Sequence, residues 1–434
     1  TTVNGGLTLD ANSAGTTVGN FAGISASGAM LQSTGSGNIS LTGQGAVNGN
    51  ADADQRGVFL QSSTMVTSAG TGTITFDGTG GDGTSSNDGV YVLNSTVQSA
   101  SGNIDLTGVG GAGASVGNRG IFVEDSSVGS AGTATVTLMG TGGNGTSDNH
   151  GVDIAGATTV VTSLTGNVQM TGVADGTTTL NRGVLVRAGA TVSSTGAATI
   201  TINGTGGDGT DDNIGVDIRD TNTSVISSTG NIDISGTGGN GSGSGNRGVL
   251  VLSEASVAST GAADIVITGT ATAGDDVDFE DTVTIGGATA AGKIDINADS
   301  LRMQTAVNVQ STGALTIAPR TANTAINLGT GATDAGLQLD DSELAFLTDG
   351  FSSITIGDAA AGTGTITVNA STFNDNVTIV GGPMAVDGLL SVTGTTTLTA
   401  GGAVAINADV TSSDNVDITA TDTAAAGQDV DIAA

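Results

Sequence analysis

One unit of sequence, written three times between residues 57 and 247, constrains this chain more than any other feature. The copies span 57–119, 120–182 and 183–247, and each consists of two related halves. The halves are about 32 residues long, which lies within the period of roughly 20–50 residues that is typical of stacked repeat proteins. The chain is therefore expected to form one elongated solenoid and not a set of separate globular domains.

Each half of the unit contains three short segments with the pattern of a β-strand. The first reads Gly-Val-x-Val, as at Val90 and Val92, and the second centres on one valine, such as Val97. The third alternates aliphatic and polar residues, as at Ile104 and Leu106, which places the aliphatic side chains on one face. No such strand buries its face alone, but turns stacked about 4.8 Å apart align like positions into aliphatic columns. The pattern predicts an all-β parallel β-helix with about three short strands per turn.

We predict three regions along this solenoid. Residues 1–22 form an incoming partial turn, and residues 23–279 carry eight long turns of about 32 residues each, including the double repeat at 57–247. Residues 280–434 continue the β-helix with shorter, irregular turns. A small insertion at 340–350 begins with acidic and serine residues before Leu, Ala and Phe, which predicts a capped helical turn.

An asparagine recurs just before each new turn. Because stacked amides can hydrogen-bond to one another along a stack, we predict a structural ladder made of Asn87, Asn118, Asn149, Asn181, Asn213 and Asn246. The residue after each ladder position alternates, and the column reads Arg56, Asp88, Arg119, His150, Arg182, Ile214 and Arg247. Arginines one turn apart would repel each other, so the double repeat is expected to separate them and to place Asp88 between two of them.

Two surface features follow from the same alignment. His150, the single histidine, falls in the alternating column, where we expect it to be solvated. The outward residues of three consecutive first strands, Phe59, Tyr91 and Phe122, form an apolar assembly stripe. One interpretation is lateral contact with another chain, and the other is burial under a corner loop that folds back.

The charge balance excludes some partners. The chain has 41 acidic and nine basic residues, a net charge of −32. Nucleic acid and anionic membranes are thus unfavourable partners. Membrane insertion is not expected, since no apolar run approaches the ~18 residues needed for a spanning helix. Cations, above all Ca²⁺, are the expected counterions, although the charge would also serve simply to keep a rod soluble.

Calcium is the one cofactor that the sequence suggests. The corner loops contain runs such as TGGDGTDDN, which match a calcium-binding pattern once but not in tandem. Gly, Asn and Asp are also the residues that tight turns require, so turn chemistry alone is the alternative. The oxygen ligands of a calcium site would come from Asp82, Asp88, Asp208, Asp211 and Asp212.

Catalysis has little support in the sequence, and we predict that the chain is not an enzyme. There is no cysteine, so disulfides and thiol chemistry are excluded. His150 has no evident catalytic partner, and adjacent acidic residues in a strand point to opposite faces. With no Trp and one Tyr, an aromatic groove for sugar stacking is also not expected.

The segment LQLDDSELAFLTDGFSSITIGD (337–358) resembles one that recurs in filamentous-haemagglutinin-like exoproteins of Gram-negative bacteria. The resemblance is carried by Leu337, Leu339, Glu343, Leu344, Gly350, Ile354, Ile356 and Gly357. It implies a right-handed β-helix, secretion through a partner pore or an autotransporter domain, and a place in adhesion or filaments.

These observations lead to two functional hypotheses. The first is a non-enzymatic, secreted or cell-surface structural rod: a filament subunit or adhesin shaft that assembles with copies of itself, end to end or laterally. The alternative is an adhesin module whose calcium-supported corner loops bind a cell-surface ligand or glycan. Both chain ends fall in strand register, so we expect either a longer native chain or end-to-end stacking.

Overall fold

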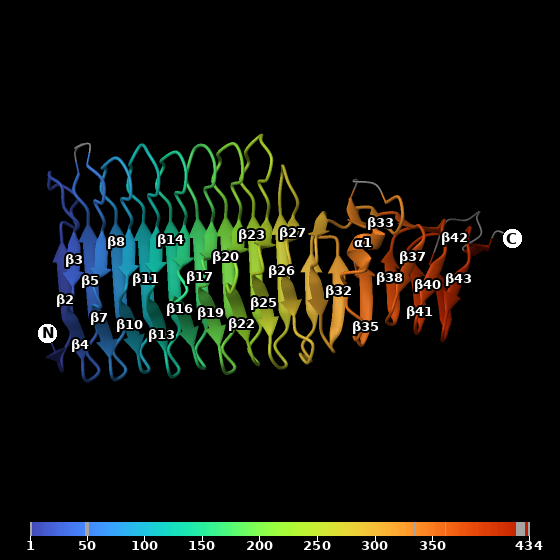
Figure 1. Cartoon of the computed structure of the whole chain (residues 1–434), viewed down its shortest axis with the longest axis horizontal. Coiled ribbons are helices and arrows are strands. Elements are labelled where there is room, and N and C mark those ends of the chain that lie inside the picture. Colours follow the sequence, from blue (N-terminus) through green and yellow to red (C-terminus); the bar gives the residue numbers. More distant parts are fainter. Residues whose placement is uncertain (1, 48–51, 333–335, 361, 422–429, 433–434) are drawn as a thin grey trace.

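The computed structural model describes residues 2–47, 52–332, 336–360, 362–421 and 430–432. The chain coils into an elongated rod with its two ends at opposite extremes (Figure 1). Each long turn contributes one strand to each of three faces, which we call the first, second and third face in chain order, and neighbouring strands are parallel. The predicted parallel β-helix with three short strands per turn is confirmed.

The third face is one continuous sheet of fifteen strands that runs the length of the rod. Its strands are β2 (Leu7–Ala11), β5 (Ile39–Gln44), β8 (Ile74–Thr79), β11 (Ile104–Val109), β14 (Val136–Thr141), β17 (Val168–Val173), β20 (Ile200–Thr205), β23 (Ile232–Thr237), β26 (Ile265–Thr270), β29 (Ile294–Asn297), β32 (Ala314–Ala318), β35 (Ser353–Gly357), β38 (Val377–Gly381), β41 (Thr396–Ala400) and β44 (Val416–Ala420). Because this sheet is unbroken, the short turns continue the same β-helix as the long ones.

The first face consists of a ten-stranded sheet followed by a six-stranded one. The ten are β3 (Ile24–Ser27), β6 (Val58–Gln61), β9 (Val90–Leu93), β12 (Ile121–Glu124), β15 (Val152–Ala155), β18 (Val184–Arg187), β21 (Val216–Arg219), β24 (Val249–Leu252), β27 (Val277–Glu280) and β30 (Leu301–Gln304). The six, in spatial order, are β34 (Leu337–Leu339), β33 (Ile326–Leu328), β36 (Ile366–Val368), β39 (Met384–Val386), β42 (Val404–Ile406) and β45 (Val430–Ile432).

The second face has eleven strands and then, after an interruption, three more. The eleven are β1 (Thr2–Val3), β4 (Met30–Ser33), β7 (Met65–Ser68), β10 (Thr96–Ser99), β13 (Ser127–Ser130), β16 (Val160–Ser163), β19 (Thr191–Ser194), β22 (Ser224–Ser227), β25 (Ser256–Ser259), β28 (Thr284–Gly286) and β31 (Asn308–Gln310). The last three are β37 (Ser371–Phe373), β40 (Leu390–Val392) and β43 (Val410–Ser412).

The register places like residues on like residues. Ile104 pairs with Val136 and Leu106 pairs with Leu138, and all four side chains are fully buried. Val97 of the second face meets Val128 in the same way. Each buried aliphatic side chain contributes about 1.5–3 kcal/mol from removal of apolar surface from water, before entropy is counted. The core is therefore a set of aliphatic columns that run along the rod axis.

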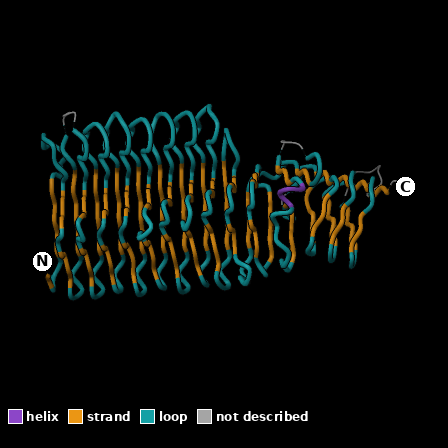
Figure 2. Tube along the Cα trace, viewed as in Figure 1, coloured by secondary structure: helices purple, strands orange, loops and turns teal. Residues whose placement is uncertain are grey.

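Turn length changes part of the way along the rod. First-face strands begin at Val90 and Ile121 in the long region, but at Ile366 and Met384 near the end of the chain. The difference lies in the corner loops, the segments that join each third-face strand to the next first-face strand. In the long region they stand in a row along one edge of the rod, and after β27 the row ends (Figure 2).

The residue that precedes each ladder asparagine has a left-handed backbone. The φ angles are 56° at Ser86, 74° at Gly117, 57° at Asp148, 60° at Leu180 and 52° at Asp212. Glycine, asparagine and aspartate tolerate this conformation, whereas a leucine is strained there. The corner loops that carry a ladder asparagine thus enter the first face through the same turn, whatever residue occupies it.

The insertion contains the one described helix, α1 (Asp341–Leu344), which confirms the predicted capped turn. The Asp340 carboxylate accepts the N–H groups of Ser342 and Glu343 at 2.8 and 3.0 Å, and the Glu343 carboxylate accepts that of Asp340 at 2.9 Å. Glu343 also accepts the Met303 N–H of β30 at 2.9 Å. It therefore occupies a hydrogen-bonding place at the edge of the ten-stranded sheet. Burial raises the pKa of Glu343 to about 7.

Two substitutions at equivalent corner-loop positions test whether the left-handed φ angle determines which residue is stable there. Leu180→Gly should raise the urea midpoint of unfolding, because the strain of about 1–2 kcal/mol for a left-handed leucine exceeds the entropic cost of glycine, about 0.5–1 kcal/mol. Gly117→Leu should lower the midpoint, although a Cβ at Gly117 would make only ordinary contacts, at 3.7 Å or more. Shifts in the same direction for both variants would contradict the role of φ.

The buried Glu343 should make stability depend on pH. Its folded pKa, about 7, lies above its usual 4.5, so the folded state binds this proton more tightly than the unfolded chain. Its contribution is complete below pH 4.5 and is lost as the pH rises through 7. The melting temperature of Glu343→Gln should accordingly fall less between pH 5 and pH 8 than that of the wild type. Glu254→Gln, at an exposed position, is the matched control and should follow the wild type.

Candidate functional site: a buried polar spine

The predicted asparagine ladder forms inside the rod, at the corner where each loop enters the first face. Each side-chain amide donates to the Oδ1 atom of the next asparagine at 2.8–3.2 Å. That same oxygen accepts the backbone N–H of the preceding asparagine at 3.0–3.2 Å. The members, all with fully buried side chains, are Asn87, Asn118, Asn149, Asn181, Asn213 and Asn246.

The ladder also anchors the corner loops. The second N–H of the Asn118 amide donates to the carbonyl of Gly113 at 3.1 Å. The amides of Asn181 and Asn213 donate to loop carbonyls of the preceding turn, those of Thr146 and Thr178, each at 3.1 Å. Every amide oxygen from Asn87 to Asn246 accepts hydrogen bonds, and most of the amide groups donate two, so this buried polar column carries little desolvation cost.

An ionic column runs beside the ladder on the outside of the first face. It contains seven of the nine basic residues of the chain: Arg56, Arg119, Arg182, Arg187, Arg219, Arg247 and Arg302. Its acidic members are Asp88, Asp153, Asp217 and Asp278, whose side chains are at most 1% exposed. We refer to the asparagine ladder and the ionic column together as the polar spine.

Asp88 lies between two arginines, as the double repeat predicted. Its carboxylate is 3.5 Å from the Arg56 guanidinium and 3.8 Å from that of Arg119, and it accepts the Arg119 backbone N–H at 3.1 Å. Burial nevertheless raises the pKa of Asp88, although both arginines act to lower it. The paired charges thus link three successive turns along the axis.

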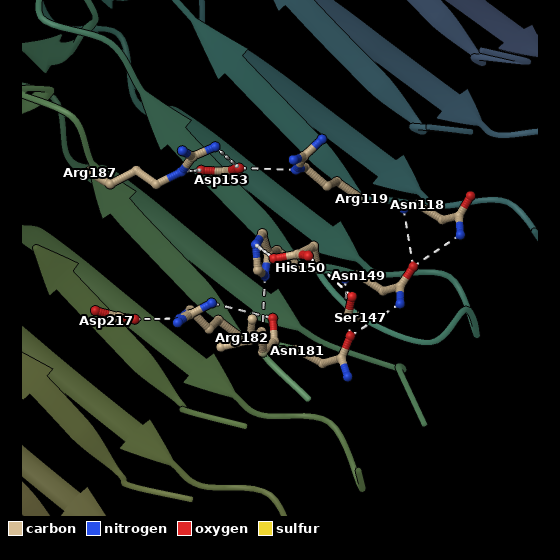
Figure 3. A network of polar contacts seen from close by, with 12 residues as sticks. Asn118, Arg119, Ser147, Asn149, His150, Asp153, Asn181, Arg182, Arg187 and Asp217 are labelled. Atoms are coloured by element: carbon tan, nitrogen blue, oxygen red, sulfur yellow. Dashed lines mark hydrogen bonds and ion pairs between the residues drawn. The ribbon is translucent and has the colours of Figure 1, made fainter. Parts of the chain in front are cut away.

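Three further aspartates extend this arrangement. Asp153 is held by Arg119 at 3.0 Å and by a bidentate contact with Arg187, both bonds at 3.0 Å (Figure 3). Asp217 contacts Arg182 and Arg219. Asp278 contacts Arg247 and Arg302. Bidentate Arg–carboxylate pairs are the strongest of the charge-assisted hydrogen bonds in proteins.

The role of these three aspartates was not predicted from the sequence. They occupy the outward position of the first-face strands, where Leu185 and Leu250 stand in intervening turns. The available sequence signal was the position of two arginines. Arg219 lies two residues after Asp217, and Arg187 lies in the turn that follows Asp153. An outward charge on a strand is ordinarily solvated, so the alternation alone did not indicate burial.

The expectation of a solvated His150 is wrong. Its side chain is 2% exposed, and its Nδ1 accepts the Arg182 backbone N–H at 3.2 Å (Figure 3). Burial, followed by the nearby Arg182 and Arg119, lowers the pKa of His150 well below its usual value. The imidazole is therefore neutral at pH 7 and separates two arginines of the column without adding charge.

The assembly stripe is also corrected, because its rings are buried. Phe59, Tyr91 and Phe122 are 9, 7 and 6% exposed and stack with centroid separations of 5.2 and 4.6 Å. Arg56 lies 4.4 Å above the Phe59 ring, and Arg119 lies 4.3 Å above the Phe122 ring. The side chains of Arg56 and Arg119 cover the stripe, so its rings are buried, as the second interpretation held, and they offer little exposed apolar area for lateral contact.

The structure does not gather the aspartates predicted to bind calcium. Asp88 belongs to the ionic column. Asp208 accepts a hydrogen bond from the Asn240 amide at 3.1 Å, Asp211 accepts the Ser244 N–H at 2.9 Å, and Asp212 lies 3.7 Å from Arg247. Asp82 is half-buried in its own loop. In the part of the chain that the structure describes, no three His, Cys, Asp or Glu side chains converge as a metal site would require.

The polar spine is suited to holding the turns of the rod together, and few of its polar groups are available for a chemical reaction. Its carboxylates are paired with guanidinium groups, its imidazole is neutral, and its amides are bonded to one another. Nearly all of these contacts join residues one turn apart, so they connect the turns along the axis. Within the described residues, no helix has the length and apolar character needed to cross a membrane.

Comparisons with protein-family models, curated proteins and solved structures returned no match. The resemblance of residues 337–358 to filamentous-haemagglutinin-like exoproteins therefore stays a prediction.

Interrupting the ladder should weaken the rod at one turn. Asn149→Ala removes the acceptor of two Asn118 donors and leaves the Asn181 oxygen without its amide donor, at a cost of about 3 kcal/mol, because unpaired buried groups cost about 1–3 kcal/mol each. Hydrogen exchange at the backbone N–H of Asn118, which loses its acceptor, should also become faster. Asn167→Ala, which removes an exposed side chain that accepts the Thr199 N–H at 3.2 Å, should cost less than about 1 kcal/mol because water replaces it. Equal losses would contradict the structural role of the ladder.

Proposed function

We propose that this protein is a non-enzymatic structural rod: an adhesin shaft or filament subunit, at the cell surface or outside the cell. The observation that carries the proposal is the polar spine, because its buried amides and ion pairs connect consecutive turns from Gln55 to Arg302. Together with the aliphatic columns and the fifteen-stranded third face, it gives three parallel sets of axial contacts. Such a structure resists bending and holds its ends a fixed distance apart.

The location outside the cell rests on the sequence. The resemblance of residues 337–358 supports it, and the absence of cysteine is compatible with export. The strong negative charge keeps a long rod soluble and separated from other copies along its sides. Burial of Phe59, Tyr91 and Phe122 leaves little of the apolar stripe exposed for lateral contact, which favours end-to-end assembly of filaments.

A second function is ligand binding by the corner loops. The observation that favours it is the row of loops along one edge, which places the same surface at regular intervals (Figure 1). Asp208 is exposed, and Asp211 is half-exposed. A glycan array with the wild type and with Asp208→Ala/Asp211→Ala, in Ca²⁺ and in EDTA, tests it. Binding that needs both the aspartates and Ca²⁺ would establish this function.

Cryo-electron microscopy of the purified chain tests the structural proposal. We expect straight rods of one width, about 70 Å long for fifteen turns at about 4.8 Å each, or multiples of that length if copies join end to end. The rods should persist in EDTA, because hydrogen bonds, ion pairs and buried aliphatic side chains connect the turns. Particles that bend sharply at a hinge, or that collapse to a compact shape, would contradict a rigid shaft.

A further inference from the structure

The residue that follows each ladder asparagine alternates between an arginine and another residue. The arginines of this alternation are Arg56, Arg119, Arg182 and Arg247. The places between them hold Asp88, His150 and Ile214, whose side chains are at most 2% exposed. Asp88 is an acid and Ile214 carries no charge at any pH. His150 is therefore the member of this set that gains a positive charge when the pH falls.

Hydrogen bonding favours the neutral form of His150. Its Nδ1 accepts the Arg182 backbone N–H at 3.2 Å, so the proton of the neutral ring is on Nε2 (Figure 3). Protonation would place a hydrogen on Nδ1 against the N–H of Arg182. One hydrogen bond between consecutive turns would thus be replaced by a contact between two donors.

The charges around His150 also oppose protonation of the ring. Burial is the largest cause that lowers the pKa of His150, and it is followed by the charges of Arg182, Arg119, Arg187 and Arg219.

The acidic groups near the ring offer it little compensation. Asp153 is already paired with Arg119 and Arg187, and Asp217 is already paired with Arg182 and Arg219. Asp148 faces the ring from its own corner loop, 3.8 Å from Nε2. Its side chain is 40% exposed, so solvent screens its attraction for the ring.

His150 lies within the contacts that join three turns. Its carbonyl accepts the Gly120 N–H of the preceding turn at 2.9 Å. The next residue, Gly151, donates its N–H to the Arg182 carbonyl of the following turn at 3.0 Å. Asn149 of the ladder is its other neighbour in the chain. Displacement of His150 would consequently loosen the turns on both of its sides.

Acidification should weaken the rod at His150. A histidine whose folded pKa lies below its usual 6.5 binds a proton more tightly in the open chain than in the folded one. Its contribution to stability is complete above pH 6.5 and decreases about tenfold per pH unit below that value, until the folded pKa is reached. Burial raises the pKa of Asp88 and of Glu343, so these two groups act in the opposite direction.

We propose that His150 is an acid-sensitive switch in the polar spine: in mildly acidic solution its protonation opens the contacts between the turns of Arg119 and Arg182, while the turns beyond them stay closed. This switch rests on the proposed function, because it acts on contacts that hold the shaft together. A shaft that is stiff at neutral pH would thereby gain a joint beside β15 in an acidic environment.

Hydrogen exchange on the full chain at pH 7.5 and pH 5 tests the switch with a matched control inside the molecule. Gly151 follows His150 and donates to the Arg182 carbonyl, whereas Gly215 follows Ile214 and donates to the Arg247 carbonyl, both at 3.0 Å. Protection factors correct for the direct effect of pH on exchange. On acidification, the protection factor should fall by at least about tenfold at Gly151 and stay unchanged at Gly215.

Three variants separate protonation from a merely structural role of the ring. His150→Gln keeps a neutral acceptor, and His150→Ile copies the residue at position 214, so either variant should abolish the acid effect at Gly151. Asp148→Asn should enlarge that effect, because the carboxylate beside Nε2 is lost. Asparagine tolerates the left-handed backbone of position 148, where φ is 57°.

The protonation state of the ring can be measured directly, because His150 is the single histidine of the chain. With ¹⁵N-labelled histidine, the ring should still give the signals of its neutral form at pH 6.5, where an ordinary histidine is half protonated. A half-protonated ring at that pH would overturn the proposal. So would equal losses of protection at Gly151 and Gly215, or an acid effect that persists in His150→Gln. Straight rods at pH 7.5 would leave the shaft proposal intact in each of these cases.

Discussion

Parallel strands stacked in register, one turn above the next, are the constraint on which the rest of this structure depends. Such stacking places each side chain about 4.8 Å from the equivalent side chain of the next turn. Aliphatic residues gain from this arrangement, as Ile104 and Val136 show. Asparagine gains too, because its amide is both donor and acceptor. Arginine and aspartate cannot stack on themselves, and the double repeat that alternates them follows directly from that limit.

The polar spine shows how one constraint yields both the ladder and the ion pairs. The ladder holds each corner loop against the loop before it, and the loops deliver Arg56, Arg119 and Arg247 over the outer side of the first face. Those side chains cover the aromatic rings and reach the buried aspartates. Charge is costly to bury, but here each carboxylate meets at least one guanidinium, so the penalty of an unpaired ion is avoided.

Sequence periodicity predicted the features that depend on which side of a strand a residue faces. The aliphatic columns, the ladder and the position of Asp88 between two arginines all follow from alignment of the repeats. Periodicity does not show what covers the outer side of a strand. The burial of Phe59 and His150 depends on side chains from neighbouring turns, so His150 was assigned to solvent and the burial of Phe59 was left open. For the same reason, Asp153 was not recognised as part of the column.

The insertion contains both a feature that the sequence predicts and one that it does not. Local chemistry around Asp340 and Glu343 predicted the capped turn, because a capping box uses residues close in the chain. The exchanged order of β33 and β34 depends on pairing between distant strands, and no local signal indicates it. That exchange inserts an additional strand into the first face, and there the rod departs from its own regularity.

Distances between spin labels along the third face test the central claim, one strand per turn in a single continuous stack. Thr75, Thr201, Thr316 and Thr397 occupy one outward column, on β8, β20, β32 and β41. Measured from Thr75 by pulsed electron paramagnetic resonance, the distances should increase linearly, to about 19, 38 and 53 Å, at about 4.8 Å per strand. A shorter or bimodal distance to Thr397 would show that the stack breaks at the insertion, and would contradict the account.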